Sequence, residues 1–131
     1  MNIPFPLEIV DSRIENWKIT FGDTVADNGS SARFVLGKRR TDPNALDLRT
    51  AGVVLYKNDQ ITGTGAGAAV LGANPFRAVA WLANTLAGAG LELAAGDVIL
   101  PGSLCGMVPV VPGDAVKADF GPLGTVSVKF S

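Results

Sequence analysis

The sequence contains no histidine. A Cys-His nucleophile, a Ser-His-Asp triad and a histidine-ligated metal all need an imidazole, so this chain can form none of them. A hard cation held by carboxylate oxygens remains open, because Mg²⁺ and Ca²⁺ prefer oxygen ligands.

Cysteine and net charge are also scarce. The single cysteine, Cys105, has no partner for an internal disulfide, and no signal peptide precedes the first expected strand. Both features fit a reducing cytoplasm, which we expect as the location. Eleven basic residues against twelve acidic ones leave a net charge of −1, so neither nucleic acid nor a membrane is an expected partner. The basic cluster at residues 38–40 is interpreted as part of a solvated polar loop over 38–47.

The length, composition and hydrophobic pattern of the chain predict one α+β domain, mostly β, over residues 1–131. Its length and 47% hydrophobic content suit a single modest core. Asn74-Pro75 predicts a helix start, with apolar residues at helical spacing from Phe76 to Leu86, and this helix is expected to cover a sheet. A further element is expected from Ile14 to about Phe21, with Trp17 packed in the core. Strands are expected at 7–11, 51–57, 60–65, 97–100, 115–120 and 125–130, with a hairpin turn at 58–59.

The stretch from Pro6 to Gly37 places carboxylates among apolar residues. Glu8 lies in a short apolar strand, where it either faces water at an edge or is buried beside a cation or hydrogen-bond donors. The segment Asp23–Ser31 is rich in residues that bond to nearby backbone. It is either a plain loop between two strands or a loop that presents amide and hydroxyl groups to an anionic ligand. The glycines at 63, 65 and 67 are attributed to close backbone approach and not to a nucleotide fingerprint.

Several motifs resemble a known family. They are L-E-I-V-D-S-R-I-x-x-W-K-I from residue 7, D-T-V-A-D-N-x-S-S from residue 23, F-V-L-G at 34–37 and G-D-V-I-L-P-G-S-L at 96–104. These motifs, spread over nearly the whole chain, resemble the second half of the 2-hydroxypenta-2,4-dienoate (2-keto-4-pentenoate) hydratases. Those enzymes sit with the 4-oxalocrotonate decarboxylases in the fumarylacetoacetate hydrolase superfamily.

The resemblance implies a fold and a site. The fold would be a curled mixed β-sheet, a β-roll like the fumarylacetoacetase C-terminal domain, with one main covering helix. The ligand would be a small 2-oxo or 2-hydroxy acid chelated by Mg²⁺ or Mn²⁺, with Glu8 as a metal ligand. Asp27 and Ser30 would be catalytic. The substrate-binding residues would be Asn28, Ser31 and Ser103.

The chain departs from the family in one respect. Family members are about twice as long, and the upstream Glu-x-Glu pair and lysine that their site uses have no counterpart here. Three hypotheses follow: a hydratase-type lyase fragment or split subunit, a descendant repurposed as a metal-free cyclase or isomerase, or a non-catalytic binding or assembly module. An unpaired apolar strand edge also predicts a homo-oligomer, or a heteromer with a partner that supplies the N-terminal half.

Overall fold

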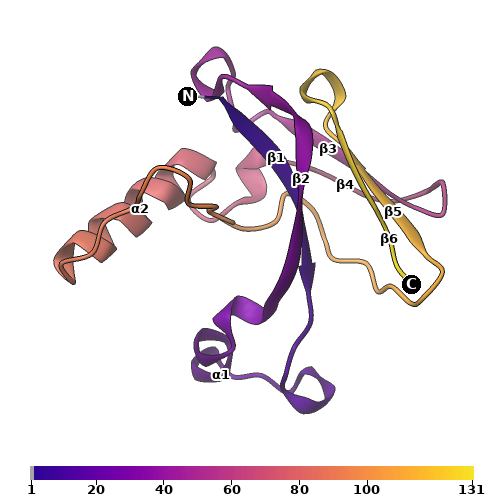
Figure 1. Cartoon of the computed structure of the whole chain (residues 1–131), viewed down its shortest axis with the longest axis horizontal. Helices are drawn as coiled ribbons and strands as arrows, with labels where there is room; N and C mark the ends of the chain where they lie inside the picture. Colours follow the sequence, from indigo (N-terminus) through magenta and orange to yellow (C-terminus); the bar gives the residue numbers. More distant parts are fainter. Residues whose placement is uncertain (1) are drawn as a thin grey trace.

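The computed structural model describes residues 2–131, which form six strands, two α-helices and short 3₁₀ turns (Figure 1). The α+β, mostly β class predicted from the sequence is confirmed. The main elements are β1 (Ile3–Val10), α1 (Phe21–Ala26), β2 (Ser31–Thr41), β3 (Gly52–Lys57), β4 (Gln60–Ala66), α2 (Pro75–Gly88), β5 (Ala115–Asp119) and β6 (Thr125–Lys129). The 3₁₀ turns are η1 (Glu15–Trp17), η2 (Asn28–Ser30), η3 (Pro43–Ala45), η4 (Gly67–Ala69) and η5 (Gly121–Leu123).

Strands β1 and β2 form a long antiparallel ribbon of their own. β1 begins at Ile3, four residues before the expected start. It contains Pro4 and Pro6, which lack a backbone N–H. They are tolerated because each strand of a two-stranded ribbon has one edge that makes no hydrogen bonds to another strand. Its first residue pairs with Thr41, so β2 extends through residues 38–41. The prediction of a polar loop over residues 38–47 is therefore wrong for residues 38–41, and the basic cluster lies on a strand.

The other four strands form an antiparallel sheet in the order β4-β3-β5-β6. The predicted hairpin between β3 and β4 is confirmed, since Asn58 and Asp59 both adopt positive φ, 50° and 64°. The strands expected near 115–120 and 125–130 are β5 and β6. Every strand pair within residues 2–131 is antiparallel, so the expected mixture of parallel and antiparallel pairing is not found there.

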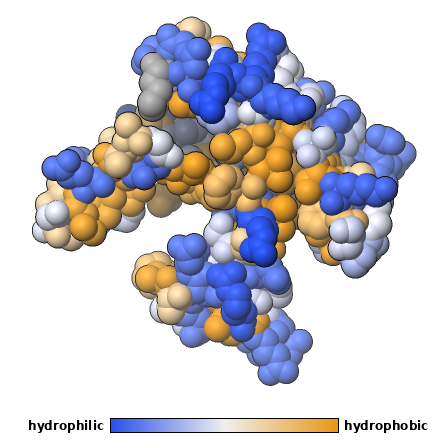
Figure 2. All heavy atoms as spheres, in the orientation of Figure 1, coloured by the Kyte–Doolittle hydropathy of each residue, from blue (hydrophilic) through white to orange (hydrophobic). Residues whose placement is uncertain are grey.

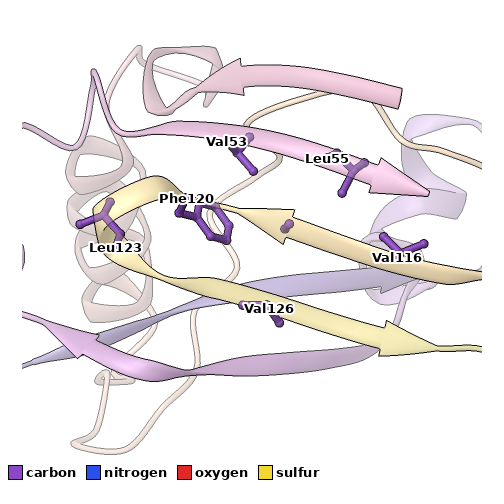
Figure 3. Packing of buried hydrophobic residues seen from close by; sticks show 7 residues of the cluster. Val53, Leu55, Val116, Phe120, Leu123 and Val126 are labelled. Atoms are coloured by element: carbon purple, nitrogen blue, oxygen red, sulfur yellow. The ribbon is translucent and has the colours of Figure 1, made fainter. Parts of the chain in front are cut away.

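A small hydrophobic core lies between the ribbon and the four-stranded sheet (Figure 3). Its buried residues come from β3, β5 and β6 and from the turn after β5; they are Val53, Leu55, Val116, Ala118, Phe120, Leu123 and Val126. From the ribbon, Leu7 and Val35 pack against this cluster, and the rings of Phe5 and Phe120 lie 5.1 Å apart. The hydrogen bonds divide the strands into two sheets, so the single curled sheet of the prediction is not confirmed.

Helix α2 begins where the sequence predicts, because the Asn74 side chain accepts a hydrogen bond from the Phe76 backbone N–H and Pro75 occupies the first turn. The expectation that it covers a sheet is wrong for residues 2–131. None of its side chains is buried, and in Figure 1 it projects away from the strands, with the following coil running back along it. No helix among these residues is long and apolar enough to cross a lipid bilayer.

Two further expectations are corrected. Residues 97–100 are coil, and the Asp97 carboxylate instead accepts a hydrogen bond from the Ala94 N–H in a local turn. Trp17 is 46% exposed, because η1 lies at the far end of the ribbon and not beside the core. The close approach predicted for the glycines is confirmed at two of the three: a Cβ at Gly65 would lie 1.8 Å from the Leu104 carbonyl oxygen, and one at Gly67 would lie 1.8 Å from the Leu48 carbonyl oxygen. At Gly63 the prediction is wrong, because a Cβ there would meet its nearest atoms at an ordinary 3.8 Å.

Candidate functional site

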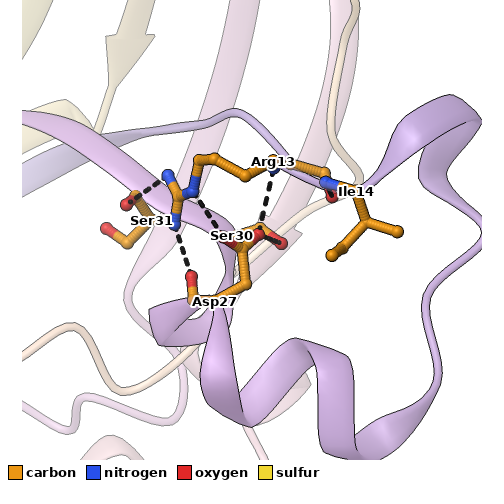
Figure 4. Close-up of polar contacts among 6 residues, drawn as sticks. Arg13, Ile14, Asp27, Ser30 and Ser31 are labelled. Carbon is orange, nitrogen blue, oxygen red and sulfur yellow. Dashed lines mark hydrogen bonds and ion pairs between the residues drawn. The ribbon is translucent and has the colours of Figure 1, made fainter.

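The segment that leads into β2 is held by Arg13, which lies in the coil between β1 and η1 (Figure 4). The Arg13 guanidinium donates through Nε to the Asp27 carboxylate and through Nη2 to the Asp27 carbonyl. Its Nη1 donates to the Ser31 carbonyl at 3.2 Å, and its backbone N–H donates to Asp27 Oδ2 at 3.2 Å. One side chain thus fixes both ends of the 27–31 loop, which we call the Asp27 loop.

Asp27 and Ser30 are the buried polar residues of this loop, with 9% and 3% of their surface exposed. The Ser30 hydroxyl donates to Asp27 Oδ2 at 2.9 Å, so both carboxylate oxygens accept hydrogen bonds from within the chain. Burial of the carboxyl acts to raise its pKa, but the hydrogen bonds from Ser30 and Arg13 and the charge of Arg13 outweigh it and lower the pKa of Asp27. The group is therefore ionised at neutral pH.

The backbone of the Asp27 loop is unusual. Asn28, Gly29 and Ser30 all have positive φ, at 54°, 65° and 58°. Two of these three residues carry side chains, and such a conformation is kept only where surrounding contacts enforce it. The Arg13 and Asp27 hydrogen bonds supply that enforcement. Asn28 is exposed and Ser31 is half-buried, and neither side chain has a hydrogen-bond partner within residues 2–131.

A short helix precedes the loop and fixes its entry. Thr20 caps α1 by accepting from the Asp23 N–H at 3.3 Å, while Asp23 accepts from the Thr20 N–H at 2.9 Å, which is a capping box. These hydrogen bonds, from the backbone and from the hydroxyl of Thr20, lower the pKa of Asp23. The sequence analysis expected a loop over residues 23–31, either a plain connection or one that binds an anionic ligand, so the part of that loop that α1 occupies is a correction. The Thr-x-x-Asp spacing at 20–23 was the available signal for the helix.

Glu8 lies on the ribbon close to the Asp27 loop. It pairs with Phe34, and two residues further along β1 Val10 pairs with Ser31, a separation of about 7 Å of strand. Opposite residues of an antiparallel pair share a face, so Glu8 lies with Pro6, Phe34 and Leu36. Leu7 and Val35 on the other face pack against the core. Glu8 therefore points away from the core.

Glu8 belongs to no larger group of potential metal ligands in the part of the chain that the structure describes. Within residues 2–131 no three His, Cys, Asp or Glu side chains lie close enough together to hold a metal ion. The residues described here therefore do not fit a divalent cation by themselves, since Mg²⁺ or Ca²⁺ would find fewer than three such side chains around Glu8.

Ser103 lies apart from the other predicted residues. It is exposed, and its hydroxyl donates to the carbonyl of Cys105. The coil that carries it runs against β4, where Gly63 and Gly65 leave room for Cys105 and Leu104. The structure thus brings Glu8, Asn28, Ser31, Asp27 and Ser30 to one end of the ribbon and leaves Ser103 beside the four-stranded sheet.

Arg13 is the residue that the sequence analysis did not assign. It lies fourteen positions before Asp27 and belongs to no short motif with it. A small pocket lies at the start of α2 and is lined by Arg49, Gly72, Ala73, Asn74 and Arg77. The Arg49 guanidinium there is already held by Asp47 at 2.7 Å and 2.9 Å, and these hydrogen bonds and the paired charge lower the pKa of Asp47.

Comparison with known proteins now adds to this geometry. No protein-family model matches the chain. It is 52% identical to the 2-hydroxyhexa-2,4-dienoate hydratase of Comamonas testosteroni and 48% identical to the 2-keto-4-pentenoate hydratase of Paraburkholderia xenovorans (strain LB400), each over 124 residues and 95% of this chain. The match covers 47% and 46% of those two proteins.

A solved structure is also similar. The 4-oxalocrotonate decarboxylase from Pseudomonas putida G7, complexed with magnesium and adipate, superposes with a TM-score of 0.89 at 46% identity, over 96% of this chain and 48% of that one. The chain spans about half the length of the relatives it matches. Over nearly its whole length it is thus homologous to one half of the 2-keto-4-pentenoate hydratases and 4-oxalocrotonate decarboxylases of the fumarylacetoacetate hydrolase superfamily, as the sequence motifs predicted.

Proposed function

We propose that this chain supplies half of a hydratase-type lyase that adds water to 2-hydroxy-2,4-dienoates and gives 4-hydroxy-2-oxoacids, in the meta-cleavage degradation of aromatic compounds. The observation that carries the proposal is 52% identity to a 2-hydroxyhexa-2,4-dienoate hydratase across 95% of the chain. A chain this similar over its whole length retains the fold that positions the relatives' chemistry, and the TM-score of 0.89 supports this.

The chain's own residues have distinct parts in this proposal. Arg13, Asp27 and Ser30 satisfy one another, so they hold the loop in its left-handed conformation and act as positioning residues. For Asp27 and Ser30 this role replaces, in the proposal, the catalytic one that the resemblance implied. The Asn28 amide and the Ser31 hydroxyl have no hydrogen-bond partner among residues 2–131, so they can donate hydrogen bonds to the carboxylate or 2-oxygen of a small 2-oxo acid. Ser103 remains a predicted substrate contact, and it would need a ligand that reaches the coil beside β4.

A divalent cation such as Mg²⁺ or Mn²⁺ belongs to the proposal as well, because the similar decarboxylase was solved with magnesium. Glu8 is the proposed ligand from this chain. The remaining ligands have to come from residues outside the described chain, since residues 2–131 hold no cluster of three ligating side chains. The proposed activity therefore belongs to an assembly and not to this chain alone.

The test replaces the matching segment of the Comamonas testosteroni hydratase with this chain. The joined protein should hydrate 2-hydroxypenta-2,4-dienoate in the presence of Mg²⁺, and the isolated chain should not. Glu8→Gln should abolish turnover by the joined protein, while Glu15→Gln, an exposed carboxylate on η1, should leave turnover unchanged. A folded, joined protein that decarboxylates 4-oxalocrotonate but does not hydrate the dienoate would refute the hydratase assignment.

A further inference from the structure

The four-stranded sheet has a polar outer face, on the side away from the core and the ribbon. On that face Tyr56 lies opposite Lys117, and Lys117 lies opposite Ser127. One pair closer to the end of the sheet, Lys129 lies opposite Ala115. Figure 2 shows hydrophilic residues over much of the lobe at the right of the view, where the β3–β4 hairpin, β5 and β6 lie in Figure 1. A polar sheet face is stable against water, so it needs no further layer to cover it.

A pocket of about 280 Å³ opens on this face. The five residues just named line it, together with Asp59 from the β3–β4 turn. The volume is close to the lower limit for small-molecule sites, so only a small ligand fits. The Tyr56 ring and the aliphatic stems of the two lysines provide apolar walls. The ammonium groups and the Ser127 hydroxyl provide hydrogen-bond donors.

Lys117 is held in place without losing its charge. Its Nζ lies 4.2 Å from the centroid of the Tyr56 ring, which is a cation–π contact. The ion pairs formed among residues 2–131 involve neither Lys117 nor Lys129. Asp119, two residues along β5, accepts a hydrogen bond from the Gly121 N–H at 2.9 Å and forms no ion pair with Lys117. Both ammonium groups are therefore able to pair with an anion.

We propose that this pocket, the Lys117 pocket, binds a small monocarboxylic acid with an apolar tail. Two ammonium groups and the Asp59 carboxylate leave the lining with a net charge of +1, which one carboxylate neutralises. A dianion would instead leave an excess negative charge beside Asp59, and like charges in one site are unfavourable. The Tyr56 ring and the lysine stems contact the tail. The pocket is separate from Glu8 and the Asp27 loop, so the proposal does not depend on the proposed function.

The experiment titrates this chain with sodium pentanoate at constant ionic strength and follows the backbone amides by nitrogen-15 NMR. The signals of Tyr56, Lys117 and Ser127 should shift and saturate. Lys129→Gln should weaken binding by about fivefold, which is the effect of one unit charge about 4 Å away in water. Lys18→Gln is the matched control, because Lys18 is exposed and follows η1 at the far end of the ribbon. It should change the affinity by less than about twofold, since salt screens a distant charge.

Three ligands and two variants decide the proposal. A linear response to pentanoate without saturation would overturn it, as would equal weakening by Lys129→Gln and Lys18→Gln. Pentan-1-ol shifting the same signals at the same concentrations would show that the carboxylate is not recognised. Sodium phosphate binding as tightly as pentanoate would refute the preference for a monocarboxylate. Lys117→Gln repeats the test from β5 and should also weaken binding by about fivefold, so the test does not depend on one variant.

Discussion

Substituting Gly65 by alanine tests how tightly the long coil after α2 is seated on the sheet. An ideal Cβ at this position lies 1.8 Å from the Leu104 carbonyl oxygen and 2.7 Å from its carbonyl carbon. An ordinary carbon–oxygen contact is about 3.3 Å, so the backbone of the coil or of β4 must move by about 1.5 Å to admit the methyl group. The obstacle is backbone, which cannot rotate aside as a side chain can.

We expect Gly65→Ala to lower the free energy of unfolding by about 3 kcal/mol or more, at the upper end of what overpacking a folded interior costs. A chain of 131 residues has a total stability of roughly 7 to 20 kcal/mol, so the loss is a large fraction of it. Thermal unfolding followed by circular dichroism should show a Tm lower by about 10 °C.

Gly63→Ala is the matched control. It lies two residues earlier on β4, on the same face, and a Cβ there meets its nearest atoms, Cys105 Sγ and Leu55 Cβ, at 3.8 Å. That contact is ordinary, so this variant should unfold within a few degrees of the parent chain. The reasoning fails if Gly65→Ala is as stable as the parent, or if both alanine variants lose the same stability. Either result would show that Leu104 is not held where the structure places it.

Three further predictions follow from the core and from the buried carboxylates. In a urea titration, Phe120→Ala should lower the free energy of unfolding by about 3 to 5 kcal/mol, because Phe120 is 7% exposed and its ring packs between the two sheets. The control Phe21→Ala should change it by less than about 0.5 kcal/mol, because Phe21 is 86% exposed. Hydrogen bonds from Lys57, Asn58 and the Val111 N–H lower the pKa of Asp114 to about 2. The ionised carboxylate therefore stabilises the fold fully above about pH 4, and this contribution is lost as the pH falls toward 2. The difference in free energy of unfolding between the parent and Asp114→Asn should close over that range. The pKa of Asp27, measured by carbon NMR, should lie below that of an unfolded aspartate and should rise in Arg13→Ala. An unchanged pKa would show that Arg13 does not stabilise the Asp27 carboxylate.

Local sequence alone determined several elements of this fold. Asn74-Pro75 starts α2 because a side-chain cap and a fixed φ act within three residues. Asn58-Asp59 turns the β3–β4 hairpin because both residues tolerate positive φ. The motifs around Glu8 and Asp27 were also sufficient to identify the homologous enzymes, because they are short and contiguous. In each case the cause and its effect lie close together in the chain.

Tertiary structure decided the rest. Arg13 and Asp27 are fourteen residues apart, and only the folded ribbon makes them partners. The length of β2 was set by its pairing with Ile3, against the polar character of residues 38–41. The same alternation of apolar residues in β2 packs Val35 on the core and leaves Phe34 exposed. A hydrophobic pattern predicts which side chains of a strand are apolar and share a face. Whether that face packs against the core depends on long-range packing, which no local window of sequence contains.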